Sequence, residues 1–389
     1  MSEKNPRMLM MEKGNVTKTL FKLGIPMVVS MLVTALYNVV DTYFVSNLGT
    51  QQSGAVSVSF PLSFYFSGVG LTFGGVGAAS YISRLLGAKE SKKANRVASV
   101  AFYTAGIIGA ILMVIFLIFI KEILIFMGAT ETILPYALQY GYIFIVSMFF
   151  STINVCSGNL AVAQGEAKVT LKAMIIGAIL NMILDPIMIT SMNMGVKGAA
   201  MATLISQIIT TIIYFQFFFG KKSYIKMKWK EFEYSSKIYG EIIKVGISML
   251  LLQALTGFSM SLISRNASSY GDAAVSAMGI VLRIVTLGTN VIFGFMKGYQ
   301  PFVGYNYGAK NYDRVKKITS TAIKWSTIYC TAWMLIVILF SNSIMTFMIN
   351  DPEVIRIGTK ALKINTAMFF TFGFQFTYAT LYLSMGGKL

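Results

Sequence analysis

The sequence predicts an all-α, polytopic membrane protein with two pseudo-symmetric six-helix lobes, the second of which ends after its fourth helix. The first observation behind this prediction is composition. The mean hydropathy is +0.67 and charged residues make up only 12% of the chain, about half the share usual in soluble domains. The second is a series of long apolar segments, and the third is a set of short patterns that occur in both halves. We therefore expect about ten membrane-crossing helices.

Each apolar segment is predicted to form one transmembrane helix. A helix needs roughly 20 apolar residues to cross the hydrocarbon core of a bilayer, and ten segments meet or exceed this length with few charges. They lie near residues 20–47, 52–82, 97–120, 132–160, 170–191, 197–219, 241–266, 273–303, 322–349 and 358–386.

The positive charge of the chain occurs in clusters. Lys and Arg number 33 against 15 Asp and Glu, which gives a net charge of +18. Position matters more than the total, because cytoplasmic loops of membrane proteins are enriched in Lys and Arg. If the first cluster is cytoplasmic, every later cluster is too, which predicts a multi-pass protein of the cell membrane with a cytoplasmic N-terminus. We do not expect nucleic acid as a partner. The clusters lie at Lys4–Lys22, Arg84–Arg96, Lys168–Lys172, Lys221–Lys244 and Lys310–Lys324.

The two halves share patterns at an offset of about 221 residues. Such repeats are typical of transporters, whose substrate route lies where the repeats meet. They predict a first lobe of six helices at 1–220, a cytoplasmic connector at 221–240 and a partial second lobe of four helices at 241–389. Two further helices would then follow residue 389, so we interpret the sequence as part of a longer chain. The matches are Leu23-Gly24-Ile25 with Val245-Gly246-Ile247, Leu48-Gly49 with Tyr270-Gly271, Gly87-Ala88-Lys89 with Gly308-Ala309-Lys310, and Phe126-Met127 with Phe347-Met348.

Two carboxylates lie well inside apolar segments. Asp41 is in the first segment and Asp185 in the fifth, whereas most other acidic residues lie in loops or at helix ends. Because a charged side chain within the bilayer is energetically costly, it marks a functional site by default. Asn181 precedes Asp185 by one turn and shares its helix face. Pro186 removes a backbone donor directly after Asp185, which can kink the helix.

Four polar side chains share one depth in the predicted first lobe. Asp41, Tyr140, Asp185 and Thr203 each fall roughly 6–9 residues from the outer end of their segment, about 9–14 Å below the outer surface at 1.5 Å per residue. Two carboxylates buried at one level would hardly both stay ionised without a cation. We therefore predict that the pair holds a proton, or Na⁺ with further oxygen ligands from Asn181 and Thr203. The alternative is that nearby amides and hydroxyls satisfy both acids without any ion.

Other polar residues are candidates to line a substrate cavity. Tyr37 and Asn38 stand one turn before Asp41, Asn154 lies in the fourth segment and Gln253 in the seventh.

Three basic residues within the predicted helices of the second lobe need an explanation, Arg265, Arg283 and Lys297, and Arg265 lies near an outer end. Arg283 is near the middle of its segment, so we expect it to face a cavity or a partner, and its role stays open. Lys297 is close enough to the inner surface for its ammonium to snorkel there.

The glycine-rich run from Gly68 to Gly77 resembles a phosphate-binding loop only superficially, because no strand precedes it. Small residues at four-residue spacing allow close helix packing in lipid, which is the function we predict for this run. The repeated Gly-Ala-Lys patterns are predicted to be cytoplasmic turns with solvated lysines, with a phospholipid head-group contact as the alternative.

Several motifs spread over nearly the whole chain are fairly specific as a set. They are Gly24-Ile25-Pro26, Leu36-Tyr37-Asn38-Val39-Val40-Asp41-Thr42 with Leu48-Gly49, Ala163-Gln164-Gly165-Glu166-Ala167-Lys168, Asn181 with Asp185-Pro186, and Gly304-Tyr305-Asn306-Tyr307-Gly308-Ala309-Lys310. With these motifs, the chain resembles the multidrug and toxic compound extrusion (MATE) family.

The resemblance implies twelve helices in two lobes that open alternately inward and outward, and export of cationic amphipathic drugs in exchange for H⁺ or Na⁺. The chain is most similar to prokaryotic members whose cation site lies in the first lobe. The residues that match that site are Asp41, Asn181, Asp185 and Thr203, with Tyr140 nearby.

The resemblance also concerns two further positions. Pro26 matches a proline associated with bending of the first helix. Other branches of the family place an acid in the seventh helix, where this chain has Gln253, so we do not expect coupling through the second lobe.

The function expected is therefore a secondary antiporter that acts as a monomer on small cationic molecules, contacts membrane lipid and needs no cofactor apart from the coupling ion. One alternative is a lipid-linked oligosaccharide flippase, which would carry several cationic residues in its cavity. A second is a non-transporting fragment. A membrane enzyme would need a metal-ligand cluster or a nucleophile with its base, and the chain has no histidine and only two acids well inside its apolar segments.

Overall fold

The computed structural model describes residues 6–386 except positions 47, 49, 128, 130, 221, 222, 233, 234, 269–271 and 349–351. The side chains of some further helical residues, Asn38 and Asp41 among them, also lie outside the described part. Within the described residues the fold is all-helical, as predicted.

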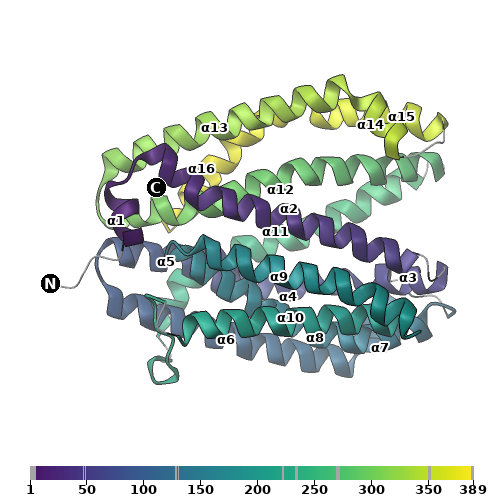
Figure 1. Cartoon of the computed structure of the whole chain (residues 1–389), viewed down its shortest axis with the longest axis horizontal. Helices are drawn as coiled ribbons and strands as arrows, with labels where there is room; N and C mark the ends of the chain where they lie inside the picture. The colour runs from purple at the N-terminus through teal and green to yellow at the C-terminus, as the bar shows by residue number, and fades with distance from the viewer. Residues whose placement is uncertain are drawn as a thin grey trace.

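The helices lie side by side along the longest axis of the molecule, and both chain termini are at the same end of the bundle, on the left in Figure 1. We call this end the terminal end and the opposite end the far end. The first half of the chain forms α1 (Pro6–Lys13), α2 (Val16–Ser46), α3 (Thr50–Ser59), α4 (Leu62–Gly70), the π-helical turn η1 (Leu71–Gly75), α5 (Val76–Gly87), α6 (Ser91–Ile118), α7 (Ile120–Phe126), α8 (Leu134–Ala163), α9 (Ala167–Pro186), the π-helical turn η2 (Ile187–Ser191) and α10 (Val196–Phe218).

The second half also combines long and short helices. Its elements are the 3₁₀ turn η3 (Trp229–Glu231), α11 (Ser236–Ser268), α12 (Asp272–Gly308), α13 (Tyr312–Leu339), α14 (Ser341–Met348), α15 (Pro352–Thr366), the 3₁₀ turn η4 (Phe369–Thr371) and α16 (Phe372–Ser384).

Eight helical stretches among the described residues are long and apolar enough to cross a membrane. The predicted segment 52–82 is divided, since α3 is a separate short helix and the span runs from Leu62 to Gly87. The predicted segment 358–386 is likewise interrupted by η4 between α15 and α16. The spans are Val16–Tyr37, Leu62–Gly87, Ser91–Ile118, Leu134–Ala163, Ala167–Ser191, Val196–Phe218, Ala277–Gly308 and Tyr312–Leu339.

The glycine-rich run is a packing surface, as predicted. A Cβ on Gly74 would collide with Cys156 of α8, and one on Gly77 would collide with the carbonyl of Ile242 in α11. The backbone adopts the π-helical turn η1 within this run. The absence of side chains therefore lets α4, η1 and α5 approach two neighbouring helices at backbone distance.

Several helix pairs join the halves of the chain, among them α2 with α12, α5 with α12 and α5 with α11. Gly298 of α12 lies against the backbone of Gly24 in α2, and Gly246 of α11 lies against the backbone of Thr72. Gly24 and Gly246 are counterparts in the sequence repeat, so equivalent glycines make equivalent close approaches on the two sides of the molecule.

The connector between the halves is attached to the terminal end of the first lobe. The buried side-chain oxygen of Gln164 accepts hydrogen bonds from the backbone nitrogens of Tyr224 (3.0 Å) and Ile225 (3.1 Å). Asn95 accepts one from the backbone nitrogen of Lys226 at 3.0 Å, and Trp229 packs edge-on against Tyr103. The Gln164 motif therefore holds the connector.

Candidate functional site

A cavity of about 300 Å³ lies among α2, α4, α8, α9 and α10 of the first lobe, with one contribution from α12 of the second. Its walls are mostly small polar and methionine side chains. The lining residues are Met27, Ser30, Met31, Thr34, Tyr37, Ser67, Ser151, Asn154, Val155, Gly158, Asn159, Val162, Thr170, Met174, Gly177, Ala178, Asn181, Thr203, Ser206, Gln207, Thr210, Tyr214 and Lys297.

Asn181 joins the cavity to the buried carboxylate of Asp185. Asp185 is fully buried, Asn181 is 2% exposed and Thr203 is 4% exposed. Asn181 Nδ2 lies 3.4 Å from Thr203 Oγ1. With its amide turned over, Nδ2 donates to Asp185 Oδ2 at 3.0 Å and Oδ1 accepts from the Thr203 backbone nitrogen at 3.2 Å, which satisfies both ends of the amide. Asn181 thus links the acid on its own helix to α10.

The backbone changes character directly after Asp185. The α-helix ends at Pro186 and continues as the π-helical turn η2. Proline removes a backbone donor, and π-helical turns occur frequently at functional sites. Asp185 therefore lies where the regular helix α9 ends, about two turns before the end of η2 at Ser191.

The predicted meeting of Asp41 and Asp185 concerns a side chain outside the described residues. The backbone places Asp41 in α2, and α2 packs against α9, the helix of Asp185. The side chain of Asn38 also lies outside the described part. A direct contact between the two acids stays a prediction.

Tyr140 is not among the residues that line the cavity. Its ring stacks on Phe144 with centroids 4.9 Å apart, it is only 4% exposed, and it belongs to an apolar cluster with Ile189 of η2. Tyr140 therefore borders the Asp185 region from the α8 side and does not line the described cavity.

Of the residues predicted to line a substrate cavity, two line the described cavity. Tyr37 and Asn154 line it. Asn154 donates to the Gln207 backbone and side-chain oxygens at 2.9 and 2.7 Å and accepts from Thr211 Oγ1 at 2.8 Å, so its polar atoms tie α8 to α10. Gln253 of α11 and the exposed Arg283 of α12 are not among its lining residues.

Lys297 is a lining residue that the sequence analysis assigned to snorkelling. It enters from α12, where Gly294 and Gly298 pack against the backbone of α2. Two glycines four residues apart are a signal of close helix packing. This spacing around Lys297 could have indicated that the lysine lies beside the first lobe.

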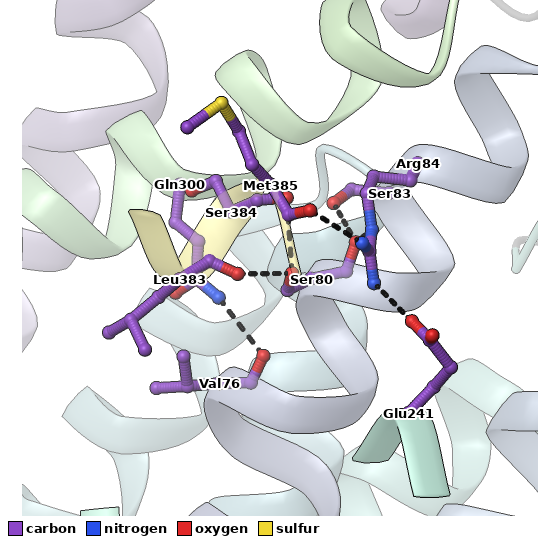
Figure 2. Close-up of polar contacts among 9 residues, drawn as sticks. All are labelled: Val76, Ser80, Ser83, Arg84, Glu241, Gln300, Leu383, Ser384 and Met385. Carbon is purple, nitrogen blue, oxygen red and sulfur yellow. Dashed lines mark hydrogen bonds and ion pairs between the residues drawn. The ribbon is translucent and has the colours of Figure 1, made fainter. Parts of the chain in front are cut away.

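A second polar site joins the lobes at the terminal end. Figure 2 shows Arg84 of α5 pointing between Glu241 of α11 and Met385, which directly follows α16. Arg84 donates to the carbonyl of Met385 at 2.8 Å and forms an ion pair with Glu241 at 3.3 Å. A cation at the C-terminal end of a helix is favourable because carbonyls there lack intrahelical partners.

Neighbouring polar groups extend this contact. Ser80 Oγ donates to the carbonyl of Leu383 at 2.7 Å, and Gln300 Nε2 lies 3.4 Å from the carbonyl of Val76. A Cβ on Gly87 would collide with the carbonyl of Tyr305, and one on Gly308 with the carbonyl of Arg84. We call these contacts of α5 with α11, α12 and α16 the terminal junction (Figure 2).

The described residues contain no group of three or more His, Cys, Asp or Glu side chains that could hold a metal ion. The predicted Na⁺ site would depend on Asp41 and Asp185 and on oxygens of Asn181 and Thr203, and because the Asp41 side chain lies outside the described residues it stays a prediction.

Comparison with known families gives a match over most of the chain. The family model described as MatE matches residues 26–187 and 245–387, which fall in the two predicted lobes. The multidrug export protein MepA of Staphylococcus aureus (strain N315) is 27% identical over 384 residues, which cover 98% of this chain and 85% of MepA.

Solved structures show the same fold. An outward-facing multidrug resistance MATE family transporter of the MOP superfamily has a TM-score of 0.92 at 26% identity, with 99% of this chain and 86% of that chain covered. A MOP superfamily transporter from Pyrococcus furiosus, whose binding pocket is described as having reverse polarity, gives the same values.

Proposed function

Because this chain belongs to the MatE family of multidrug efflux transporters, we propose that it exports cationic amphipathic molecules across the cell membrane in exchange for H⁺ or Na⁺. Family membership makes it a multi-pass membrane transporter of small molecules and not an enzyme. The ion coupling, the charge of the substrate and the orientation in the membrane belong to the proposal.

The observation that carries the proposal is the fully buried Asp185, linked through Asn181 to a cavity in the first lobe. A carboxylate inside a membrane protein is stable only with a partner, a proton or a metal cation. Asp185 can therefore change its charge when an ion arrives, and the Asn181 amide donates a hydrogen bond to it while its oxygen faces Thr203. This position suits a coupling site next to a substrate site.

Coupling then follows from competition between ion and substrate. Binding of H⁺ or Na⁺ neutralises the acidic end of the cavity, so a cationic substrate loses its attraction and leaves. One coupled charge gains about 2.3 kcal/mol per 100 mV of membrane potential. This energy sustains a substrate concentration ratio of roughly fiftyfold, since 1.4 kcal/mol corresponds to a factor of ten.

Alternating access requires that one end of the bundle open while the other is closed. The terminal junction closes one end by joining α5 to helices of the second lobe. The basic clusters predict that this end is cytoplasmic. We propose that the junction separates when substrate enters from the cytoplasm.

Dye transport in everted membrane vesicles tests the coupling. We expect Asp185→Asn and Asp41→Asn each to reduce ion-driven uptake of a cationic dye by roughly tenfold or more, because a neutral amide cannot exchange charge. Asp313→Asn, at an exposed position of α13, is the matched control. Uptake should also require Na⁺ at fixed pH if Na⁺ is the coupling ion. Full transport by both the Asp41 and the Asp185 variants would contradict the proposal.

The flippase alternative expects several cationic residues in the cavity. Lys297 is the single Lys or Arg among the described lining residues. The cavity therefore does not favour a lipid-linked pyrophosphate.

A further inference from the structure

Lys297 brings a positive charge into a cavity that otherwise belongs to the first lobe. All other lining residues come from α2, α4, α8, α9 and α10, whereas Lys297 projects from α12. No other charged side chain occurs among the described lining residues. An ionisable side chain at membrane depth is a functional-site hypothesis by default.

Within the described residues, no acidic side chain forms an ion pair with Lys297. Asp41 is too far along α2 to be one. The glycines that flank Lys297 pack against Gly24 and Val28, and Asp41 lies more than three turns further along the helix, about 20 Å at 1.5 Å per residue. A lysine side chain extends only about 6 Å, so the backbone alone excludes this pair.

The cavity therefore has two ends of opposite charge. Lys297 enters at the level of Met27, which packs against Val162 and Ala167 near the terminal end. Asn181 carries the link to Asp185 at the other end of the lining. Along α9, Ala167 and Asn181 are separated by about 20 Å of helix. The Lys297 side chain covers about 6 Å of this separation. A rigid amphiphile of about 10–15 Å would therefore extend from the Lys297 ammonium to the acidic end of the cavity.

We propose that Lys297 binds an anionic group of the transported molecule, so that zwitterionic amphiphiles with a carboxylate and a cationic amine are preferred substrates. This inference deepens the proposed function and rests on it. The carboxylate accepts a charge-assisted hydrogen bond from the ammonium while the cationic group lies toward Asp185. Such hydrogen bonds are stronger than neutral ones, and they restore the pairing that Lys297 does not find among its described neighbours.

Binding of two matched dyes tests the role of Lys297 without any ion gradient. The dyes are a rhodamine with a free carboxylate and its ethyl ester, in which an added ethyl group removes the negative charge. Dissociation constants are measured by fluorescence anisotropy on the full chain in detergent. We expect Lys297→Met to weaken binding of the carboxylate dye roughly tenfold or more, the usual size for a hydrogen bond to a charged group. Binding of the ester should be unchanged or become tighter.

Two variants control for folding and for surface charge. Lys297→Arg keeps the positive charge and should retain the preference for the carboxylate dye. Lys168→Met removes an exposed lysine at the start of α9 and should change neither dye. Equal weakening of both dyes by Lys297→Met, or no effect on either, would overturn the proposal.

A lipid head group is the other source of an anion, and one further measurement separates it. Phosphatidylglycerol is titrated into both dye experiments. One outcome is that the lipid displaces the carboxylate dye from the protein with native Lys297 but not from Lys297→Met, at a concentration below the dissociation constant of the dye. In that case the anion site binds lipid, and the substrate assignment is wrong. Because these measurements need no coupling ion, their failure is distinct from a failure of Asp185 to couple transport.

Discussion

The first-lobe cavity and the terminal junction are built on opposite principles. The cavity leaves about 300 Å³ among side chains such as Met27, Met31 and Met174, which can adapt to ligands of different shapes. The junction leaves no room: Gly87 and Gly308 pack against carbonyls of the opposite lobe. A binding site for varied molecules needs a cavity that side chains and different ligands can fill. A closed end of the bundle needs backbone contacts that leave no room for water or substrate.

The junction and the cavity also differ in whether their polar side chains have hydrogen-bond partners. Arg84 and Ser80 each find partners across the junction, at helix ends and in an ion pair. In the cavity, Ser206 Oγ is a buried hydroxyl with no hydrogen-bond partner among the described residues. Paired groups stabilise one arrangement, while unpaired groups in a cavity are available to a ligand.

The largest expected effect is that of adding a side chain at the junction. Gly308→Val would place atoms against the carbonyl of Arg84, and overpacking of this kind costs about 1–3 kcal/mol. We expect the open form of the junction to become roughly tenfold or more populated. Maleimide labelling of Ser80→Cys, a fully buried position, measures the opening, because the native Cys156 and Cys330 are buried.

Gly106→Ala is the control for this substitution, since a Cβ there meets nothing within 4 Å. Labelling at position 80 should be the same with and without it. Unchanged labelling in Gly308→Val would mean that the close approach does not hold this end shut.

A smaller effect is expected from the ion pair of the junction. Glu241→Gln removes a partly exposed pair, with side chains 11% and 25% exposed, which is worth about 1 kcal/mol or less. Arg84→Gln also removes the bond to the Met385 carbonyl and should cost about 1 kcal/mol more. The same labelling assay should therefore rank Arg84→Gln above Glu241→Gln.

The exposed pair of Arg356 and Glu353 on α15 provides the matched control. Arg356→Gln should leave labelling at position 80 unchanged. An equal effect of Arg84→Gln and Glu241→Gln would show that the bond to the end of α16 contributes nothing.

The smallest effect is expected in the cavity. Ser206→Ala removes a buried hydroxyl without a described partner, so the free energy of unfolding should change by less than about 0.5 kcal/mol. If ligands use this hydroxyl, dye affinity should fall severalfold. Ser157→Ala removes a similar buried hydroxyl of α8 that does not line the cavity, and it should leave dye binding unaltered.

The sequence by itself determined the class of protein and the acidic end of the site. Crossing a bilayer requires long apolar segments, and this requirement acts on each segment separately. Asp185 is predicted to be functional from its own segment alone, because placing a carboxylate among apolar residues of a membrane helix costs free energy whatever the neighbouring helices are. The pairing of Asn181 with Asp185 also follows from helix periodicity, which needs no knowledge of the neighbouring helices.

Only the tertiary structure decided which way side chains face and which helices meet. Tyr140 is predicted from its depth to join the polar site, but its ring stacks on Phe144 and is not among the cavity-lining side chains. Lys297 could have reached the inner surface by its length, yet the contact of Gly298 with Gly24 brings it to the first lobe. Depth along a helix follows from counting residues, whereas direction around the helix depends on partners far away in the chain, and no local pattern contains them.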